Sequence, residues 1–216
     1  MTVYIEKPAV NLREELASLR NQGGYQEQQF YFDGLVTNGT FDSDTDWTKG
    51  TGWTISGGAA YANSGTSDGA YFEQNIGLVS GKTYYYTMTV GGTVSGSNYL
   101  AVRVGGTADN FAITSTGVKT GTVTATGSGN LRIRSEAATA TITLDDVAFF
   151  EVDASNDVIH TMPKGWKPKD VFEDGLLQRE GAAHDYEVVY DGFDYVVKPT
   201  VAPSATTQTC VIGVKA

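Results

Sequence analysis

Groups that support covalent cross-links or catalysis are scarce in this sequence. A single cysteine, Cys210, excludes an internal disulfide. Only two histidines are present, His160 and His184, and neither lies in a motif typical of metal-dependent or nucleophilic catalysis. No apolar run approaches the roughly 20 residues that a membrane-spanning helix needs. These absences predict a protein without enzymatic activity that is stabilised by packing or by assembly.

Positive charge is also in short supply. The 15 Lys and Arg residues stand against 25 acidic residues, so the formal net charge is −10. Such an acidic surface repels nucleic-acid phosphates and anionic membranes, and neither is expected as a partner. The first residues carry Glu6, Glu14 and Glu15 where a signal peptide would have its apolar core. No signal peptide is therefore expected.

Residues that favour strands and tight turns are abundant. There are 26 glycines and 12 tyrosines, with many threonines and valines. Alternating apolar and polar residues recur between residues 34 and 152, as in TYYYTMTVGG, YLAVRVGG and NLRIRS. Short strands at this spacing, joined by glycine-rich turns, predict two packed antiparallel sheets. The predicted fold class is mainly β.

The pattern divides the chain into three segments. Residues 1–33 form an extended arm with a short helix over NLREELASLR, followed by a flexible, glutamine-rich connector, GGYQEQQFYF. Residues 34–152 form the β-sandwich. Residues 153–216 form a linker and a small β domain, in which Asp174-Gly175 and Asp191-Gly192 predict hairpin turns.

The N-terminal helix needs a surface to pack against. It is shorter than the roughly 12–15 residues that an isolated helix requires in water. Its leucines therefore pack either on the protein's own domain or on another chain, and the sequence leaves both alternatives open. The residues predicted to anchor the arm are Val3, Ile5, Leu12, Leu16 and Leu19.

The middle segment carries motifs of a known kind. NGTF is followed by a pair of tryptophans, Trp47 and Trp53, then by QNIGLVSGKTY, and last by LDDV. In this order the motifs resemble the carbohydrate-binding jelly rolls found beside xylanases and cellulases, over about residues 35–152. The resemblance implies a jelly-roll β-sandwich. We expect both tryptophans, which lie in the opening loop, to cap its core.

The resemblance also implies two sites. That family often holds a structural calcium ion through a carboxylate of the last strand and backbone oxygens near the start. In this sequence the carboxylate of the last strand corresponds to Asp145, with Asp146 beside it. The backbone oxygens near the start correspond to residues 38–40. The alternative is a pair of carboxylates that face solvent. Glycan-binding members set aromatic and polar side chains along a concave sheet, and the outward candidates are Gln74, Tyr85, Tyr99, Arg103, Arg132 and Arg134.

The flanking segments resemble proteins of tailed phages. The start, MTVYIEKPAVNLREELASL, is similar to the N-termini of virion proteins, and VFEDGLLQREGAAHDYEVV is similar to a small module of phage structural proteins. The resemblance implies a virion protein, a capsid decoration or head fibre anchored to a capsid or tail protein, with a homotrimer expected by analogy. The alternatives are a tail fibre that contacts host glycans and a free carbohydrate-binding module.

The remaining reactive residues have simpler interpretations. Asp42, Asp44 and Asp46 alternate in a loop with no apolar wall to raise a pKa, so we expect a solvated loop. Cys210 lies in TTQTCVIGV, alternating with Ile212 and Val214, and is expected to be a buried small apolar residue. No cofactor is expected besides the structural calcium ion.

Overall fold

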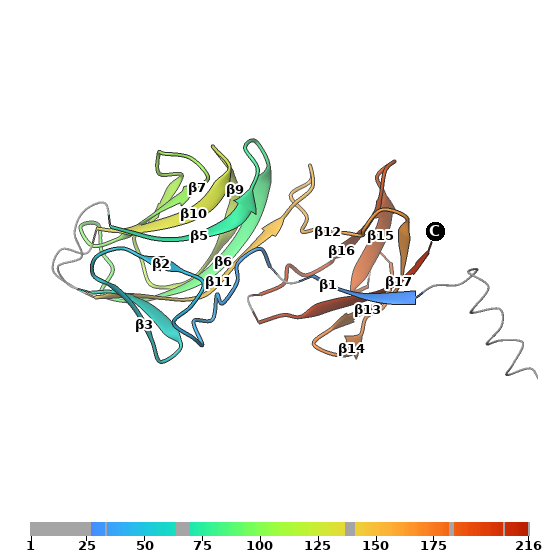
Figure 1. Ribbon diagram of the computed structural model, residues 1–216, viewed down its shortest axis with the longest axis horizontal. Coiled ribbons are helices and arrows are strands. Elements are labelled where there is room, and N and C mark those ends of the chain that lie inside the picture. Colours follow the sequence, from blue (N-terminus) through green and yellow to red (C-terminus); the bar gives the residue numbers. More distant parts are fainter. Residues whose placement is uncertain are drawn as a thin grey trace, which may run out of the picture.

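The protein folds into two β modules that lie side by side (Figure 1). The computed structural model describes residues 27–32, 34–63, 70–136, 141–181, 184–204 and 206–215. Every regular element in these ranges is a strand, so the predicted mainly-β class is confirmed. The same ranges contain no helix with the length and apolar character to cross a membrane.

The first module is a jelly-roll β-sandwich of two antiparallel five-stranded sheets, as predicted. The β5 sheet has the order β2 (Thr48–Lys49), β5 (Tyr71–Leu78), β10 (Gly129–Ser135), β7 (Leu100–Val104) and β8 (Phe111–Ile113). The β6 sheet has the order β3 (Trp53–Ser56), β4 (Ala59–Ala62), β11 (Ile142–Glu151), β6 (Thr83–Gly92) and β9 (Gly117–Thr124). Apolar residues from both sheets alternate into one core between them.

An aromatic stack closes one end of that core. Phe72 of β5 lies between the two indoles, with ring centroids 4.4 Å from Trp47 and 4.8 Å from Trp53. Both tryptophans are buried, as predicted. Their ring nitrogens donate hydrogen bonds to the backbone carbonyls of Asn38 and Ala70. The opening loop is therefore held down by the rings and by their polar edges.

The second module has a four-stranded and a three-stranded sheet. The four-stranded sheet has the order β1 (Glu27–Phe32), β17 (Thr209–Lys215), β13 (Trp166–Glu173) and β14 (Leu176–Leu177). The three-stranded sheet has the order β12 (His160–Thr161), β16 (Tyr195–Pro199) and β15 (Tyr186–Tyr190). The core of this module is formed by Met162, Val171, Tyr186, Val197 and Val211.

Both predicted hairpins are present in the second module. Asp174 and Gly175 join β13 to β14 with φ values of 49° and 79°, the left-handed values that a type I′ turn requires at both positions. Asp191 and Gly192 lie in the loop between the paired strands β15 and β16. Local turn chemistry was therefore sufficient to predict both reversals.

The prediction of a flexible connector before the sandwich is wrong for residues 27–32. All six residues of β1 pair with β17 in the four-stranded sheet. Phe30 and Phe32 pack on the core of the second module, while Gln28 and Gln29 are exposed. The chain thus contributes a strand to the second module before it enters the sandwich, because alternate phenylalanines gain burial there. The division into three segments stays a prediction.

The predicted burial of Cys210 is also wrong. The alternation in β17 exists, but Thr209, Val211 and Gly213 point inward, and Cys210 lies on the partly exposed face. Gly213 allows this close packing, because a Cβ atom there would lie 2.7 Å from Phe30 and 2.8 Å from Met162. The small residue therefore marks the buried face of the strand.

The two modules meet at the end of β11. Phe150 of β11 packs with Ala148, Val152 and Val158 in a small apolar cluster. His160 of β12 contacts Phe150 on one side and Phe32 of β1 on another, with centroid distances of 6.5 and 5.2 Å.

The predictions for the N-terminal arm lie outside the described residues. They are the helix over residues 11–20 and the anchoring residues Val3, Ile5, Leu12, Leu16 and Leu19.

Candidate functional site

Polar side chains from three adjacent strands gather on the outer face of the β5 sheet. In β10, Leu131 and Ile133 point into the core, so Arg132 and Arg134 point outward. In β7 the same alternation turns Arg103 outward. The register places Arg132 opposite Arg103 on one side and opposite Glu73 of β5 on the other. Strand alternation and register together therefore assemble this group.

Carboxylates pair with every guanidinium of the group. Arg132 Nε donates to Glu73 Oε2 at 2.5 Å. Arg103 Nε and Arg134 Nη2 donate to the two oxygens of Asp109 at 2.6 and 2.9 Å, and Arg134 also pairs with Glu136. Asn130 Nδ2 donates to the same Glu73 oxygen at 3.2 Å. We call the three arginines and three carboxylates the arginine array.

The electrostatics of Asp109 show that the array is mutually stabilised. Partial burial alone would raise the pKa of the Asp109 carboxyl. The hydrogen bonds and charges of Arg103 and Arg134 outweigh that effect and hold the pKa of Asp109 below its usual value. Asp109 therefore stays ionised and fixes two guanidinium groups in place.

Tyr71 provides an aromatic ring beside the array. The guanidinium carbon of Arg103 lies 4.9 Å from the centroid of the Tyr71 ring, and that of Arg132 lies 6.0 Å from it. Cation–π contacts of this kind hold the planar guanidinium groups in a defined orientation. The array thus presents ordered N–H donors and carboxylate acceptors around one ring, and its three positive and three negative charges cancel.

Four of the six residues predicted to bind a glycan come from this part of the β5 sheet. Arg103, Arg132 and Arg134 share its outer face. Tyr99 leads into β7, and its carbonyl accepts the backbone N–H of Glu136 at 2.9 Å. Their adjacency could not be predicted from sequence, because it depends on which strands pair.

Gln74 was expected to point outward, and this is wrong. It is buried, and its side-chain amide bonds the backbone N–H and C=O of Thr37 at 2.8 Å and the carbonyl of Asp46 at 3.1 Å. Gln74 therefore holds the opening loop in place. It lies on the inner face with Phe72 and Ile76, and this alternation turns Tyr71 and Glu73 outward.

Tyr85 does not lie with the arginines. It belongs to β6 in the other sheet and packs against the apolar cluster at the module junction. Four residues of the site were not predicted from the sequence: Tyr71, Glu73, Asp109 and Glu136. For Tyr71, the alternation in YFEQNI was an available signal. For Asp109, which follows β7 in a loop, the sequence pattern carried none.

The predicted calcium residues lie beside the opening turn. The backbone N–H of Val147, next to Asp146, donates to the carbonyl of Gly39 at 2.9 Å, so residues 38–40 and the last strand do come together. Partial burial raises the pKa of Asp145, and the negative charges of Asp146 and Asp42 raise it further. In the part of the chain that the structure describes, no three His, Cys, Asp or Glu side chains cluster to hold a metal. A calcium ion there would need two carboxylates and backbone carbonyls.

Calcium binding at Asp145 stays a prediction with a direct test. Excess calcium should raise the melting temperature relative to EDTA, since a ligand at 100 times its Kd stabilises a fold by about 2.7 kcal/mol. Asp145→Asn should remove the rise, whereas Asp44→Asn, which changes an exposed acid of the opening loop, should keep it. Differential scanning calorimetry measures each rise. An equal rise in Asp145→Asn and wild type would contradict the site.

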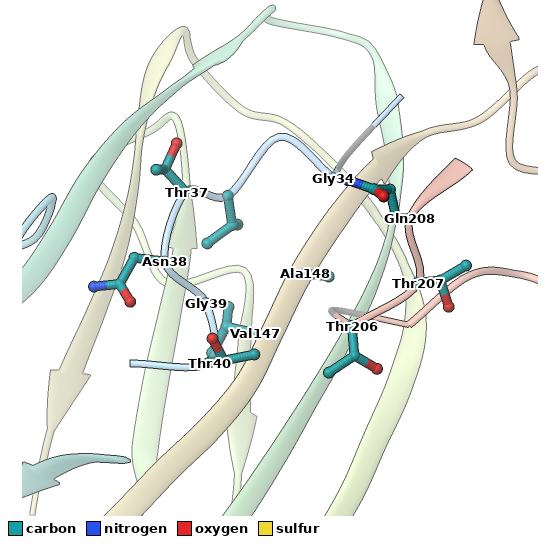
Figure 2. Close-up of a pocket in the computed structure, with 11 residues that line it drawn as sticks. Gly34, Thr37, Asn38, Gly39, Thr40, Val147, Ala148, Thr206, Thr207 and Gln208 are labelled. Carbon is teal, nitrogen blue, oxygen red and sulfur yellow. The ribbon is translucent and has the colours of Figure 1, made fainter. Parts of the chain in front are cut away.

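A hollow of about 350 Å³ lies where the two modules meet. Figure 2 shows Thr206, Thr207 and Gln208 of the second module on one side, with Val147 and Ala148 of β11 and the opening stretch of the sandwich on the other. Hydroxyl, amide and backbone groups line it together with the apolar side chains of Val36, Val147 and Ala148, and none of its described lining residues is charged. The two modules therefore share a polar seam at this point.

Comparison with known proteins gave matches among solved structures only. No protein-family model and no curated protein matches the sequence. The chain is similar to the N-terminal cellulose-binding domain of Cellulomonas fimi β-1,4-glucanase C, with 21% identity and a TM-score of 0.42 over 55% of this chain and 97% of that domain. The second N-terminal cellulose-binding domain of that enzyme gives 13% identity and a TM-score of 0.41, over 56% and 96%.

A third similar structure is the C-terminal CBM6 of LamC, a laminarinase from Zobellia galactanivorans. It is 11% identical, with a TM-score of 0.31 over 55% of this chain and 99% of that domain. At such identities the likeness concerns the jelly-roll fold and does not extend to a ligand.

Proposed function

We propose that the sandwich binds a neutral oligosaccharide across the outer face of β5, β10 and β7. The observation that carries this proposal is the arginine array, a set of ordered donors and acceptors with no net charge. Each sugar hydroxyl both donates and accepts hydrogen bonds, so it can bond a guanidinium N–H and a carboxylate oxygen together. A carbohydrate-binding role is also what the sequence motifs implied for this segment.

The charge balance favours a neutral ligand over an anionic one. A uronate or sulfate group would approach the carboxylates of Glu73 and Asp109 as closely as the guanidinium groups, so repulsion by the carboxylates would offset its attraction to the arginines. Hydroxyl groups can bond the array as it stands. Because the side chains are already held by ion pairs and by Tyr71, little conformational entropy is lost on binding.

Removing one arginine tests the proposal. Arg132→Ala should weaken binding by about 10- to 100-fold, the effect of losing a charged hydrogen-bonding partner. Titration calorimetry of the full chain with cellohexaose, xylohexaose and chitohexaose measures the change. Arg179→Ala is the matched control, because Arg179 is an exposed arginine with an ion pair on the second module, and it should bind like wild type. Equal affinities for Arg132→Ala and wild type would contradict the proposal.

A structural role in a tailed-phage particle is a second proposal. It is supported by the resemblance of the flanking segments to virion proteins. The Asp174-Gly175 hairpin between β13 and β14 falls within one of those segments, VFEDGLLQREGAAHDYEVV. A location on the virion, a capsid or tail partner, homotrimer formation and the absence of enzymatic activity stay predictions. In that setting, the sandwich would present its sugar-binding face to host glycans.

A further inference from the structure

A second candidate site lies on the other module, at the turn between β15 and β16. A pocket of about 230 Å³ there is lined by Trp166, Tyr190, Phe193, Asp194 and Tyr195, with Gly165 beside them. The Phe193 side chain is 84% exposed, and Tyr190 is exposed as well. Exposed aromatic rings around a hollow mark a binding surface more often than a lone exposed apolar residue does.

The loop that presents Phe193 is tied down by its own hydrogen bonds. The carboxylate oxygen Oδ1 of Asp191 accepts the backbone N–H groups of Phe193 and Asp194, at 2.8 and 2.9 Å. The backbone N–H of Asp191 in turn donates to the carbonyl of Asp194 at 3.2 Å. The exposure of Phe193 is therefore imposed by an ordered turn, which keeps the ring available to a ligand.

The other rings of the pocket are held by contacts with neighbouring side chains. Tyr190 and Tyr195 contact each other at 5.1 Å between centroids. Trp166 is packed edge-on by Phe30 at 5.1 Å, and the ammonium group of Lys215 lies 5.0 Å from its centroid. These contacts fix the rings before any ligand arrives.

Asp194 supplies an acceptor in the same pocket. Its Oδ1 atom is shielded from water and has no hydrogen-bond partner in the described part of the chain. A shielded acceptor without a donor is unfavourable, so the Asp194 carboxylate gains a hydrogen bond if its side chain turns toward a ligand hydroxyl in the pocket. An apolar protein segment laid on the rings would leave this oxygen unsatisfied.

We propose that this pocket binds a pyranose ring of a neutral glycan. The C–H groups on one face of the sugar would stack on the rings of Tyr190 and Phe193, whose π faces carry partial negative charge. A hydroxyl at the edge of the sugar would donate to the Asp194 carboxylate after its side chain turns toward the pocket. The site lies on a different module from the arginine array and does not depend on it. Two sites on one chain would bind a long polysaccharide more tightly than either alone.

The test uses the full chain, with Arg132→Ala added to silence the first site. The probes are cellohexaose, xylohexaose, chitohexaose and maltohexaose. Tryptophan fluorescence and titration calorimetry measure their binding. Phe193→Ala should weaken the remaining binding by about tenfold, and Asp194→Ala should weaken it as well. Leu177→Ala is the matched control, because Leu177 is 61% exposed on β14 outside the pocket, and it should bind like its parent.

The outcomes distinguish the pocket from the arginine array, and a glycan ligand from a protein partner. Binding that survives Arg132→Ala and is lost in Phe193→Ala supports this proposal even if the first site fails. Three results would overturn it: no binding of any probe in the Arg132→Ala background, equal affinities with and without Phe193, or self-association that Phe193→Ala abolishes. The last result, measured by light scattering, would make the surface a protein interface.

Discussion

Replacing Phe72 by alanine should lower the free energy of unfolding of the sandwich by about 3–5 kcal/mol, the range for a fully buried phenylalanine. Phe72 has no exposed surface and contacts three aromatic rings, those of Trp47, Trp53 and Phe41. Its removal leaves a cavity between two indoles that are tied to the backbone and cannot close over it. Because the free energy of unfolding of a typical domain is about 5–15 kcal/mol, the expected loss is a large fraction of the stability of the sandwich.

Urea denaturation followed by tryptophan fluorescence measures the loss, since two of the three tryptophans flank the cavity. Phe193→Ala is the matched control, because the same substitution at a ring that is 84% exposed should change stability by about 0.5 kcal/mol or less. Similar losses in the two variants would show that the stack does not stabilise the sandwich as described.

Acidification from neutral pH to about pH 4 should remove about 3 kcal/mol of stability through His160 alone, from the difference between the pKa of about 4 in the folded state and the usual 6.5. Burial causes this shift: His160 is 4% exposed, and its Nε2 has no hydrogen-bond partner among the described residues. Between the two pKa values the unfolded chain binds a proton that the folded chain excludes. Stability therefore falls as the pH drops from 6.5 and levels off below about 4.

The free energy of unfolding at several pH values, compared between wild type and His160→Gln, isolates this contribution. The variant should lose less stability on acidification, even if its stability at neutral pH is lower. Thr161→Ala is the control, because Thr161 is exposed in the same strand and carries no ionisable group, so its substitution should leave the wild-type pH dependence intact. A pH profile that is the same in His160→Gln and wild type would contradict the assigned burial. Since His160 contacts Phe150 and Phe32, the effect reports on the junction of the modules.

The strands and turns of this protein follow from local rules. The period-two alternation in TYYYTMTV and NLRIRS predicted β6 and β10, and the Asp-Gly pairs predicted the two hairpins. The alternation of side chains along a strand and the dihedral angles of a turn depend on neighbouring residues. The burial of Trp47 and Trp53 was predicted as well. These features need no knowledge of the rest of the chain.

The face that each strand buries was less predictable. Gln74 was predicted to point outward and Cys210 inward, and both predictions are wrong. Gln74 is inward because its amide bonds Thr37, 37 residues away. Cys210 is outward because Val211 and Gly213 face the rings and apolar groups of Phe30 and Met162. A shift of one residue exchanges the buried and exposed faces of a strand. Contacts with residues that are distant in the sequence decide which face is buried.

The sequence by itself determined the β class, the positions of many strands and the turns that join them. Only the tertiary structure decided that β1 joins the second module, that three arginines meet across β10 and β7, and that Trp166 lies beside the turn of β15 and β16. The physical reason is the range of the interactions. Alternation and turn formation act between neighbours, whereas strand pairing joins segments that are distant in the chain and are selected by the burial they gain together.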